Sequence, residues 1–208
     1  DVRQLGCHMV GMATMVTSPL EISRQQRKAA ALHAQRGGPS IDALTQLQVD
    51  ERADWTPEQV VDAAAKVGPR AVRLRHIIST VAGSVTMGDR QEVNGREEPW
   101  TMGYLARTIL TRDPWMHRTD LAAATGRPMI LTAEHDGAIV ADVVAEWAVR
   151  HGQPFSLELT GTAGGTWSSD EDGTAAPPET ITMDAVDFCR VVSGRGTGEG
   201  LLATEVPF

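Results

Sequence analysis

The sequence has few aromatic residues, few cysteines and no long apolar run. Aromatic residues make up 4% of the 208 residues and apolar residues 41%, so aliphatic side chains and methionine must fill most of any core. The longest apolar runs fall well short of the roughly 18 residues that a membrane-spanning helix needs. We therefore expect no transmembrane segment and a chain long enough to bury a core in one large domain or two small ones.

Cys7 and Cys189 are the only cysteines. Two cysteines in a chain of this length do not make the disulfide framework of a small secreted protein. No signal peptide opens the sequence. A reducing, cytoplasmic location is the expectation.

Basic residues are outnumbered by acidic ones. The formal net charge is −8 and the isoelectric point is near 5.2. Binding to nucleic acid or to an anionic membrane needs a basic face, so we expect neither of these partners.

The first two-thirds of the chain is predicted to be helical. Apolar residues recur at helical spacing, and Ser18-Pro19 and Thr56-Pro57 have the form of helix starts, with a cap followed by proline. Gly126 followed by Pro128 is a stop signal. The predicted helices cover residues 1–16, 21–35, 40–52, 56–68 with a restart or kink at Pro69 toward Ile78, and 100–125, whereas 87–99 reads as a charged loop.

The last third mixes both types of structure. A helix is predicted over 136–151, short strands over 154–160, 164–167 and 179–183, and a helix over 185–193 that Asp184 caps. An acidic, Gly/Pro-rich turn lies between, over 168–178, and an apolar end follows over 201–208. The fold class is therefore mainly α with a small α+β part: an up-and-down helical bundle over 1–127 and a small α/β domain over 128–208, joined near 126–134.

The chain opens inside a helical pattern. Val2, Leu5, Met9, Met12 and Val16 recur at helical spacing from the first residues, with little lead-in and no initiator Met. We expect that an N-terminal segment of the bundle is absent from this sequence.

Asp113 and His117 are the strongest candidates for metal ligands. Side chains four residues apart lie one turn apart on the same helix face, which is how a helix offers two ligands to one ion. The alternative is that Asp113 caps a helix restarting at Pro114, with His117 a surface or core residue. His8, on the first predicted helix, is a third candidate that antiparallel packing could bring to the same point. Two imidazoles and one carboxylate leave open positions on Zn²⁺, as in catalytic sites.

Other polar residues have weaker signals. Cys7 is about 100° around the helix from His8, and Cys189 is on the apolar face of its predicted helix, so both are expected to pack rather than bind metal. Arg190 and Arg195 could bind a substrate carboxylate or could simply be solvated near a helix end. Asp120 could orient a ligand or form a surface ion pair with its neighbours.

Three segments together resemble a known family. They are VRQLGCHMVG at 2–11, TRDPWMHRTD at 111–120 and DFCRVVSGR at 187–195. The chain resembles, along its whole length and in the same order, the mycothiol-dependent maleylpyruvate isomerase family of DinB-like metal-binding bundles. The resemblance implies a divalent metal held by His8, Asp113 and His117, and mycothiol as the thiol that the metal activates. Asp113 stands where the best-known member has Glu, a side chain one methylene longer.

Three hypotheses for function follow. The first is a cytoplasmic enzyme that uses a divalent metal, zinc by preference, and a low-molecular-weight thiol, mycothiol. It would act as an isomerase or S-transferase on a small electrophile, with Arg190 and Arg195 as catalytic-site candidates that hold an acidic substrate. The second is a hydrolase on the same three ligands. The third is a non-catalytic binding protein of the same fold. None of them predicts an oligomeric state.

Overall fold

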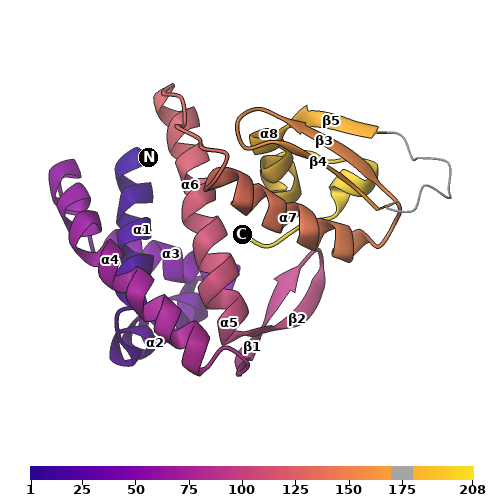
Figure 1. The fold of residues 1–208 in the computed structure, drawn as a ribbon. Helices are drawn as coiled ribbons and strands as arrows, with labels where there is room; N and C mark the ends of the chain where they lie inside the picture. The colour runs from indigo at the N-terminus through magenta and orange to yellow at the C-terminus, as the bar shows by residue number, and fades with distance from the viewer. Residues whose placement is uncertain (170–179) are drawn as a thin grey trace. The chain divides into compact units, whose positions relative to one another are not determined.

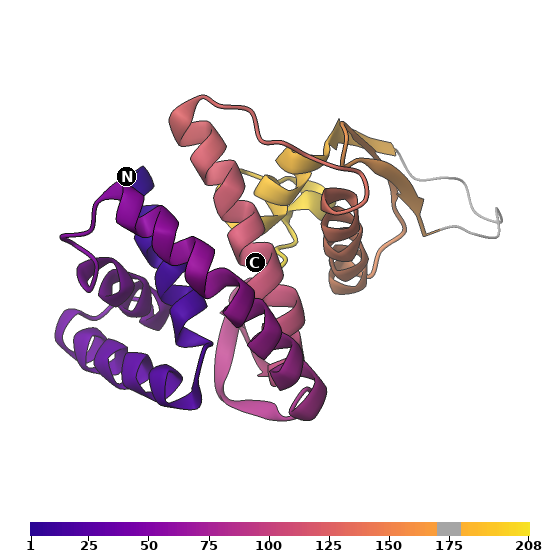
Figure 2. The ribbon, with the colours of Figure 1, turned by 60° about the vertical axis from the view of Figure 1, so that its left-hand side comes forward.

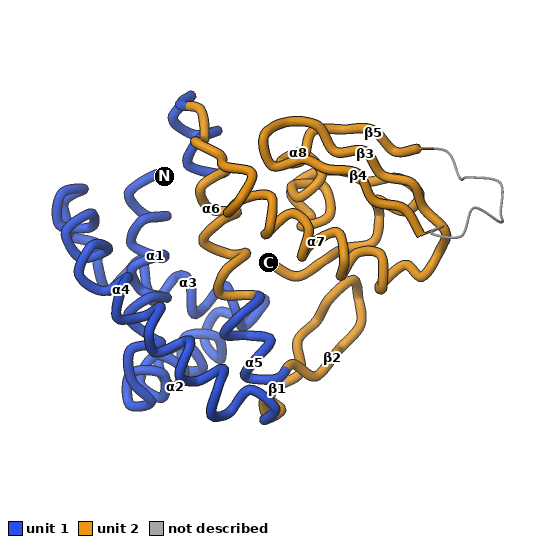
Figure 3. Tube along the Cα trace, viewed as in Figure 1, with its two compact units in different colours: residues 1–85, 101–108, 120–127 blue, residues 86–100, 109–119, 128–208 orange. Residues whose placement is uncertain are grey.

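A computed structural model describes residues 1–169 and 180–208 and shows a mainly helical chain (Figure 1). The contacts divide it into two compact units (Figure 3). Unit 1 contains residues 1–85, 101–108 and 120–127, and unit 2 contains residues 86–100, 109–119 and 128–208. The prediction of a mainly α chain with a small α+β part is confirmed.

The units do not follow the predicted domain limits at every point. Their last division falls between residues 127 and 128, but residues 86–100 and 109–119 make most of their contacts within unit 2. The division into one domain over residues 1–127 and a second over residues 128–208 therefore stays a prediction. No helix in the described part of the chain has the length and apolar character needed to cross a membrane.

Unit 1 is built from four helices near the start of the chain (Figure 2). They are α1 (Val2–Met15), α2 (Pro19–Arg36), α3 (Ser40–Asp50) and α4 (Pro57–Val81). Helix α1 packs on α3 and α4, and α2 packs on α3. The small apolar core contains Cys7, Val10 and Val60, which exclude water where α1 meets α4.

The helix starts confirm the capping signals. Ser18 Oγ accepts the Glu21 N–H at the start of α2, and Thr56 forms a capping box with Gln59 at the start of α4. Helix α4 then continues through Pro69 to Val81, so the predicted restart does not occur.

The buried face of α3 is not made of its most apolar residues alone. Ile41 is 57% exposed, whereas Gln48 is fully buried and Ala43 is 7% exposed. The buried face of α3 thus carries a polar side chain that satisfies a hydrogen-bond network, described below. Helix α3 is therefore turned so that Gln48 joins this hydrogen-bond network, although Ile41 is left exposed.

Residues 87–99 form a hairpin, so the loop prediction was wrong. Strand β1 (Thr86–Val93) pairs with β2 (Arg96–Thr101) in a two-stranded sheet. Asn94 has φ 52° and Gly95 has φ 70°, as a two-residue type I′ turn requires. Most of the hairpin is polar and exposed, so it lacks the apolar alternation that identifies a strand, and Asn-Gly was its one sequence signal.

The helix predicted over 100–125 starts slightly later and is not uniform. Thr101 caps α5 (Met102–Tyr104), a π-helical turn follows over Leu105–Ile109, and α6 (Leu110–Thr125) completes it. Pro114 lies inside α6, so Asp113 does not cap a helix that restarts there. Gly126, at φ 67°, lies just after α6, as the stop signal predicted.

The C-terminal part of unit 2 packs helices on a three-stranded sheet. Helix α7 (Asp136–His151) precedes β3 (Ser156–Thr160), β4 (Gly165–Ser168) and β5 (Thr180–Asp184), and α8 (Ala185–Arg190) follows. The sheet order is β4-β3-β5; β3 is antiparallel to β4 and parallel to β5. Short turns follow α8 at Val191–Arg195 and Gly200–Ala203. The predicted acidic turn lies mostly outside the described residues, over 170–179.

Trp147 is at the centre of the unit 2 core. Its ring is fully buried and makes edge contacts with Phe155 and Phe188. Leu157 and Leu159 alternate with exposed residues along β3, as the sequence predicted for a half-buried strand. An aromatic ring fills a large volume, so these three rings supply much of the packing in this core.

Candidate metal centre

His8 is a buried histidine on α1. Its exposed fraction is 7%, and its Nδ1 lies 2.8 Å from Oε1 of Gln48 on α3. A hydrogen bond at one ring nitrogen of a histidine fixes how the ring is turned and which tautomer it adopts.

Gln48 belongs to a buried chain of amides within unit 1. Gln48 Nε2 donates to Gln25 Oε1 at 2.9 Å, and Gln25 Nε2 donates to Glu21 Oε1 at 2.9 Å and to the Gly11 carbonyl at 3.3 Å. Gln25 and Gln48 are both fully buried. Such groups are stable away from water only when they are hydrogen-bonded, which these bonds achieve.

The chain of amides ends at an ion-pair cluster on the surface of α2. Arg24 bonds to Glu21 and Glu51, and Lys28 bonds to Glu51 at 2.8 Å. Hydrogen bonding to Arg24 lowers the pKa of Glu21 and holds the pKa of Glu51 at about 2. Both carboxylates are therefore ionised at neutral pH and can only accept hydrogen bonds.

Asp113 and His117 lie one turn apart on α6, as their spacing predicted. Asp113 Oδ1 is 3.3 Å from His117 Nε2, and their side chains are 25% and 12% exposed. The neighbouring Trp115 and Met116 are buried in the unit 2 core, as expected for packing residues. The local geometry thus places a carboxylate and an imidazole together on one helix face.

Buried contacts hold α6 in unit 2. Arg112, 1% exposed, bonds to Asp142 and Glu146 of α7 and donates to the Pro207 carbonyl at 3.1 Å. Trp115 Nε1 donates to Asp136 Oδ1 at 2.9 Å. These contacts restrain the helix that carries the pair, which a preorganised site requires.

The three predicted ligands are divided between the two units: His8 belongs to unit 1, and Asp113 and His117 belong to unit 2. Two imidazole nitrogens and a carboxylate oxygen suit Zn²⁺ and similar divalent ions. Within unit 2 the structure pairs Asp113 with His117, and the addition of His8 as a third ligand stays a prediction.

Arg190 and Arg195 are placed at the end of α8 and in the turn after it. Arg190 is half-buried and Arg195 is exposed, and both belong to unit 2. Nothing in the structure assigns them a substrate. Their proposed contact with a carboxylate therefore stays a prediction.

Both cysteines are unpaired and buried, as expected for packing residues. Burial raises the pKa of the Cys189 thiol to about 12, so it is not a nucleophile at neutral pH. Cys7 Sγ contacts the Arg52 carbonyl at 3.7 Å.

Gln25, Gln48 and Arg112 were missed from the sequence. Glutamine and arginine usually lie on the surface, and no spacing marks the few that are buried. Arg118, which flanks His117, bonds to Asp136 and the Ile130 carbonyl within unit 2 and so has a structural role.

No protein-family model, curated protein or solved structure matches this chain. The evidence that bears on function is therefore the Asp113–His117 pair of unit 2 and the buried His8 of unit 1.

Proposed function

We propose that this protein is a metal-dependent enzyme of the DinB-like type that uses mycothiol as its thiol. The divalent ion, zinc by preference, would be held by His8, Asp113 and His117. The observation that supports this is the pairing of Asp113 with His117, whose Oδ1 and Nε2 lie 3.3 Å apart on one face of α6. His8 is added as the third ligand on the resemblance of residues 2–11 to the family. The class of thiol rests on the resemblance of residues 2–11, 111–120 and 187–195 to the mycothiol-dependent family.

The donor set fits a catalytic ion better than a structural one. Structural zinc sites are closed by four protein ligands, whereas three ligands leave a position for substrate. When bound, the ion supplies positive charge that lowers the pKa of a coordinated thiol. Contacts within the chain would hold the ligand side chains in place. Gln48 fixes the His8 ring, and the backbone of α6 fixes Asp113 relative to His117.

The reaction proposed is thiolate attack on a small electrophile. Addition to a conjugated double bond, rotation and elimination would give an isomerase, and retention of the new carbon–sulfur bond would give an S-transferase. Arg190 and Arg195 are the candidates for holding a substrate carboxylate, since guanidinium binds carboxylate through two parallel hydrogen bonds. Two unpaired, buried cysteines fit a cytoplasmic location.

Metal analysis of the purified protein tests the site. We expect about one equivalent of zinc or a similar ion in the wild type, since three ligands suit one ion. His117→Ala should lose that ion. His76→Ala is the matched control, because His76 is an exposed histidine of α4 that is not one of the proposed ligands. Absence of metal from the wild type, or its retention in His117→Ala, contradicts the proposal.

Thiol dependence tests the reaction class. The metal-loaded protein should consume a small electrophile, such as an unsaturated dicarboxylate, only when mycothiol is present. Turnover of an ester or amide without thiol would support a hydrolase on the same ligands. Bound metal with neither activity would favour a binding protein.

A further inference from the structure

Gln48 is placed to decide which nitrogen of His8 carries the proton. Gln48 Oε1 lies 2.8 Å from His8 Nδ1, and the Gln48 amide is fully buried. An amide oxygen can only accept a hydrogen bond. The direction of this bond therefore depends on which way the Gln48 amide is turned.

The far end of the amide chain sets that direction. Gln25 Nε2 bonds to the Glu21 carboxylate and to the Gly11 carbonyl, and both of these groups only accept. Gln25 must therefore present its oxygen to Gln48, and Gln48 must present its nitrogen to Gln25. Gln48 Oε1 is then left to accept from His8 Nδ1.

We propose that Gln48 is a positioning residue that keeps His8 protonated on Nδ1, so that Nε2 carries the lone pair for the metal. The proposal rests on the metal site proposed above. The ionised Glu21 carboxylate at the start of α2 can only accept a hydrogen bond, and this fixes the direction of every bond in the chain. The chain runs from Glu21 through the buried amides of Gln25 and Gln48 to the ring of His8. Removing a hydrogen-bond partner of a metal-binding histidine lowers metal affinity by about 10- to 100-fold.

The ring nitrogens of His8 can be read without metal. Two-bond ¹H–¹⁵N spectra of the metal-free protein should show His8 as the Nδ1–H tautomer in the wild type and as a mixture or the Nε2–H tautomer in Gln48→Leu. A wild-type His8 protonated on Nε2 would overturn the proposal whatever the metal content.

Metal affinity provides the second readout. Cobalt titration against a chelator should show binding about 10-fold or more weaker in Gln48→Leu, with an altered Co²⁺ absorption spectrum. Gln48→Glu, which still accepts from Nδ1, should retain more affinity than Gln48→Leu. Gln46→Leu is the control, because Gln46 is an exposed residue of the same helix that bonds to exposed Asp50.

The outcomes separate the two proposals. Equal cobalt affinity in Gln48→Leu and wild type removes the role of Gln48 and leaves the metal site standing. A wild type that binds no cobalt removes the metal site itself. If Gln48→Leu does not fold, Gln48→Glu carries the comparison.

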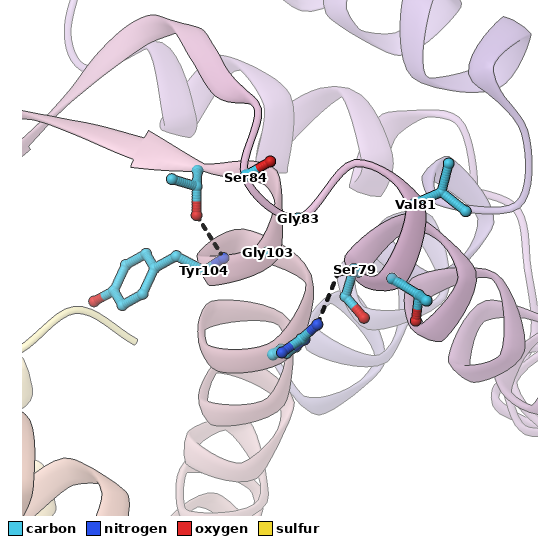
Figure 4. Close-up of a pocket in the computed structure, with 9 residues that line it drawn as sticks. Ser79, Val81, Gly83, Ser84, Gly103 and Tyr104 are labelled. Carbon is cyan, nitrogen blue, oxygen red and sulfur yellow. Dashed lines mark hydrogen bonds between the residues drawn. The ribbon is translucent and has the colours of Figure 1, made fainter.

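A different observation, confined to unit 1, points to a second binding site. A pocket of about 500 Å³ lies between the end of α4 and the start of α5 (Figure 4). Gly83 and Gly103 form part of its lining, and the Gly103 N–H donates to the Gly83 carbonyl at 3.0 Å. A Cβ on Gly103 would lie 2.7 Å from that carbonyl oxygen, so the close approach requires glycine.

The remaining lining is polar and carries one positive charge. Hydroxyl-bearing residues Thr80, Ser84 and Thr101 belong to the lining, and Arg107 contributes a guanidinium. One Arg107 nitrogen donates to the Ser79 carbonyl at 2.9 Å, and a guanidinium has five N–H donors in all. The lining residues include no carboxylate.

We infer that this pocket binds a small hydroxylated carboxylate. The Arg107 guanidinium would pair with the carboxylate and the surrounding hydroxyl groups would bond to the hydroxyls of the ligand. A volume of about 500 Å³ is in the range of small-molecule sites and exceeds what an inorganic anion fills.

Gluconate and glucose are matched probes, since they share hydroxyl groups and differ in the carboxylate. Gluconate should shift the backbone amide signals of residues 79–84 and 101–107, and glucose should not. Arg107→Met should weaken gluconate binding about 10-fold, and Ser84→Phe should block the pocket, whereas Arg73→Met on α4 should have no effect. The inference is overturned if glucose binds as tightly as gluconate, or if Arg107→Met and Ser84→Phe both bind gluconate as the wild type does. Stronger binding of inorganic phosphate than of gluconate would also contradict it.

Discussion

Gly11 of α1 lies directly against Gln48 of α3. A Cβ built on Gly11 would be 2.5 Å from Gln48 Cβ, well inside contact distance. The absence of a side chain at Gly11 thus lets the buried amide chain reach His8, and it links the packing of α1 on α3 to the candidate metal site.

Gly11→Ala is expected to destabilise the protein. The two helices would have to separate, at a cost of about 1–3 kcal/mol for an overpacked contact. Chemical denaturation measures this change in the free energy of unfolding. Gly137→Ala is the control: a Cβ there meets its nearest neighbour at 3.8 Å, so the change should be neutral or slightly stabilising. Equal effects of the two substitutions would show that the contact with Gln48 is unimportant.

Arg112→Met is expected to destabilise unit 2 by about 3 kcal/mol. The substitution removes one of the two arginines that pair with Glu146, whose side chain is only 17% exposed and which keeps Arg150. It also removes the bonds from the buried guanidinium to Asp142 and to the Pro207 carbonyl. Urea denaturation followed by tryptophan fluorescence measures the loss. Arg118→Met, at a side chain that is 36% exposed, should cost less. The reverse order would contradict the anchoring role of Arg112.

Asp136 should make stability depend on pH in the acid range. Burial opposes its ionisation, but bonds from Thr132, Trp115 and Arg118 outweigh burial and hold its pKa at about 2. Because this folded-state pKa is below the ordinary value of 3.8, the stabilisation is present above about pH 4 and is lost as pH falls toward 2. The stabilisation is on the order of 2 kcal/mol.

Asp136→Asn tests this pH dependence. The variant should be less stable than the wild type at pH 6, and the difference in unfolding free energy should shrink as pH is lowered from 4 to 2. A difference that is constant over this range would mean that the charge of Asp136 contributes nothing.

Gly95→Ala should loosen the β1–β2 hairpin. An L side chain at φ 70° costs about 1 kcal/mol relative to glycine. Hydrogen exchange of the β1 and β2 amides should become faster, whereas Asn94→Gly, which tolerates the same backbone, should leave it nearly unchanged. Slower exchange in Gly95→Ala would contradict the turn assignment.

Local sequence signals predicted the helix starts and the proximity of Asp113 to His117. Ser18, Thr56 and Asp184 cap the helices that follow them. The distance between Asp113 and His117 follows from helical geometry alone. The alternation of Leu157 and Leu159 with polar residues indicated strand β3. Each of these signals depends on residues within one helical turn or one strand, so it can be read without the tertiary structure.

The sequence by itself thus determined the helix starts, the mainly α character and the placement of Asp113 and His117 on one helix face. Only the tertiary structure decided that Gln48 rather than Ile41 is buried on α3, and that Arg112 anchors the chain end at Pro207. These contacts join residues far apart in sequence, and a buried polar side chain is stable only when such distant partners satisfy it. Periodicity marks a face as apolar, but it carries no information about a hydrogen bond to another helix.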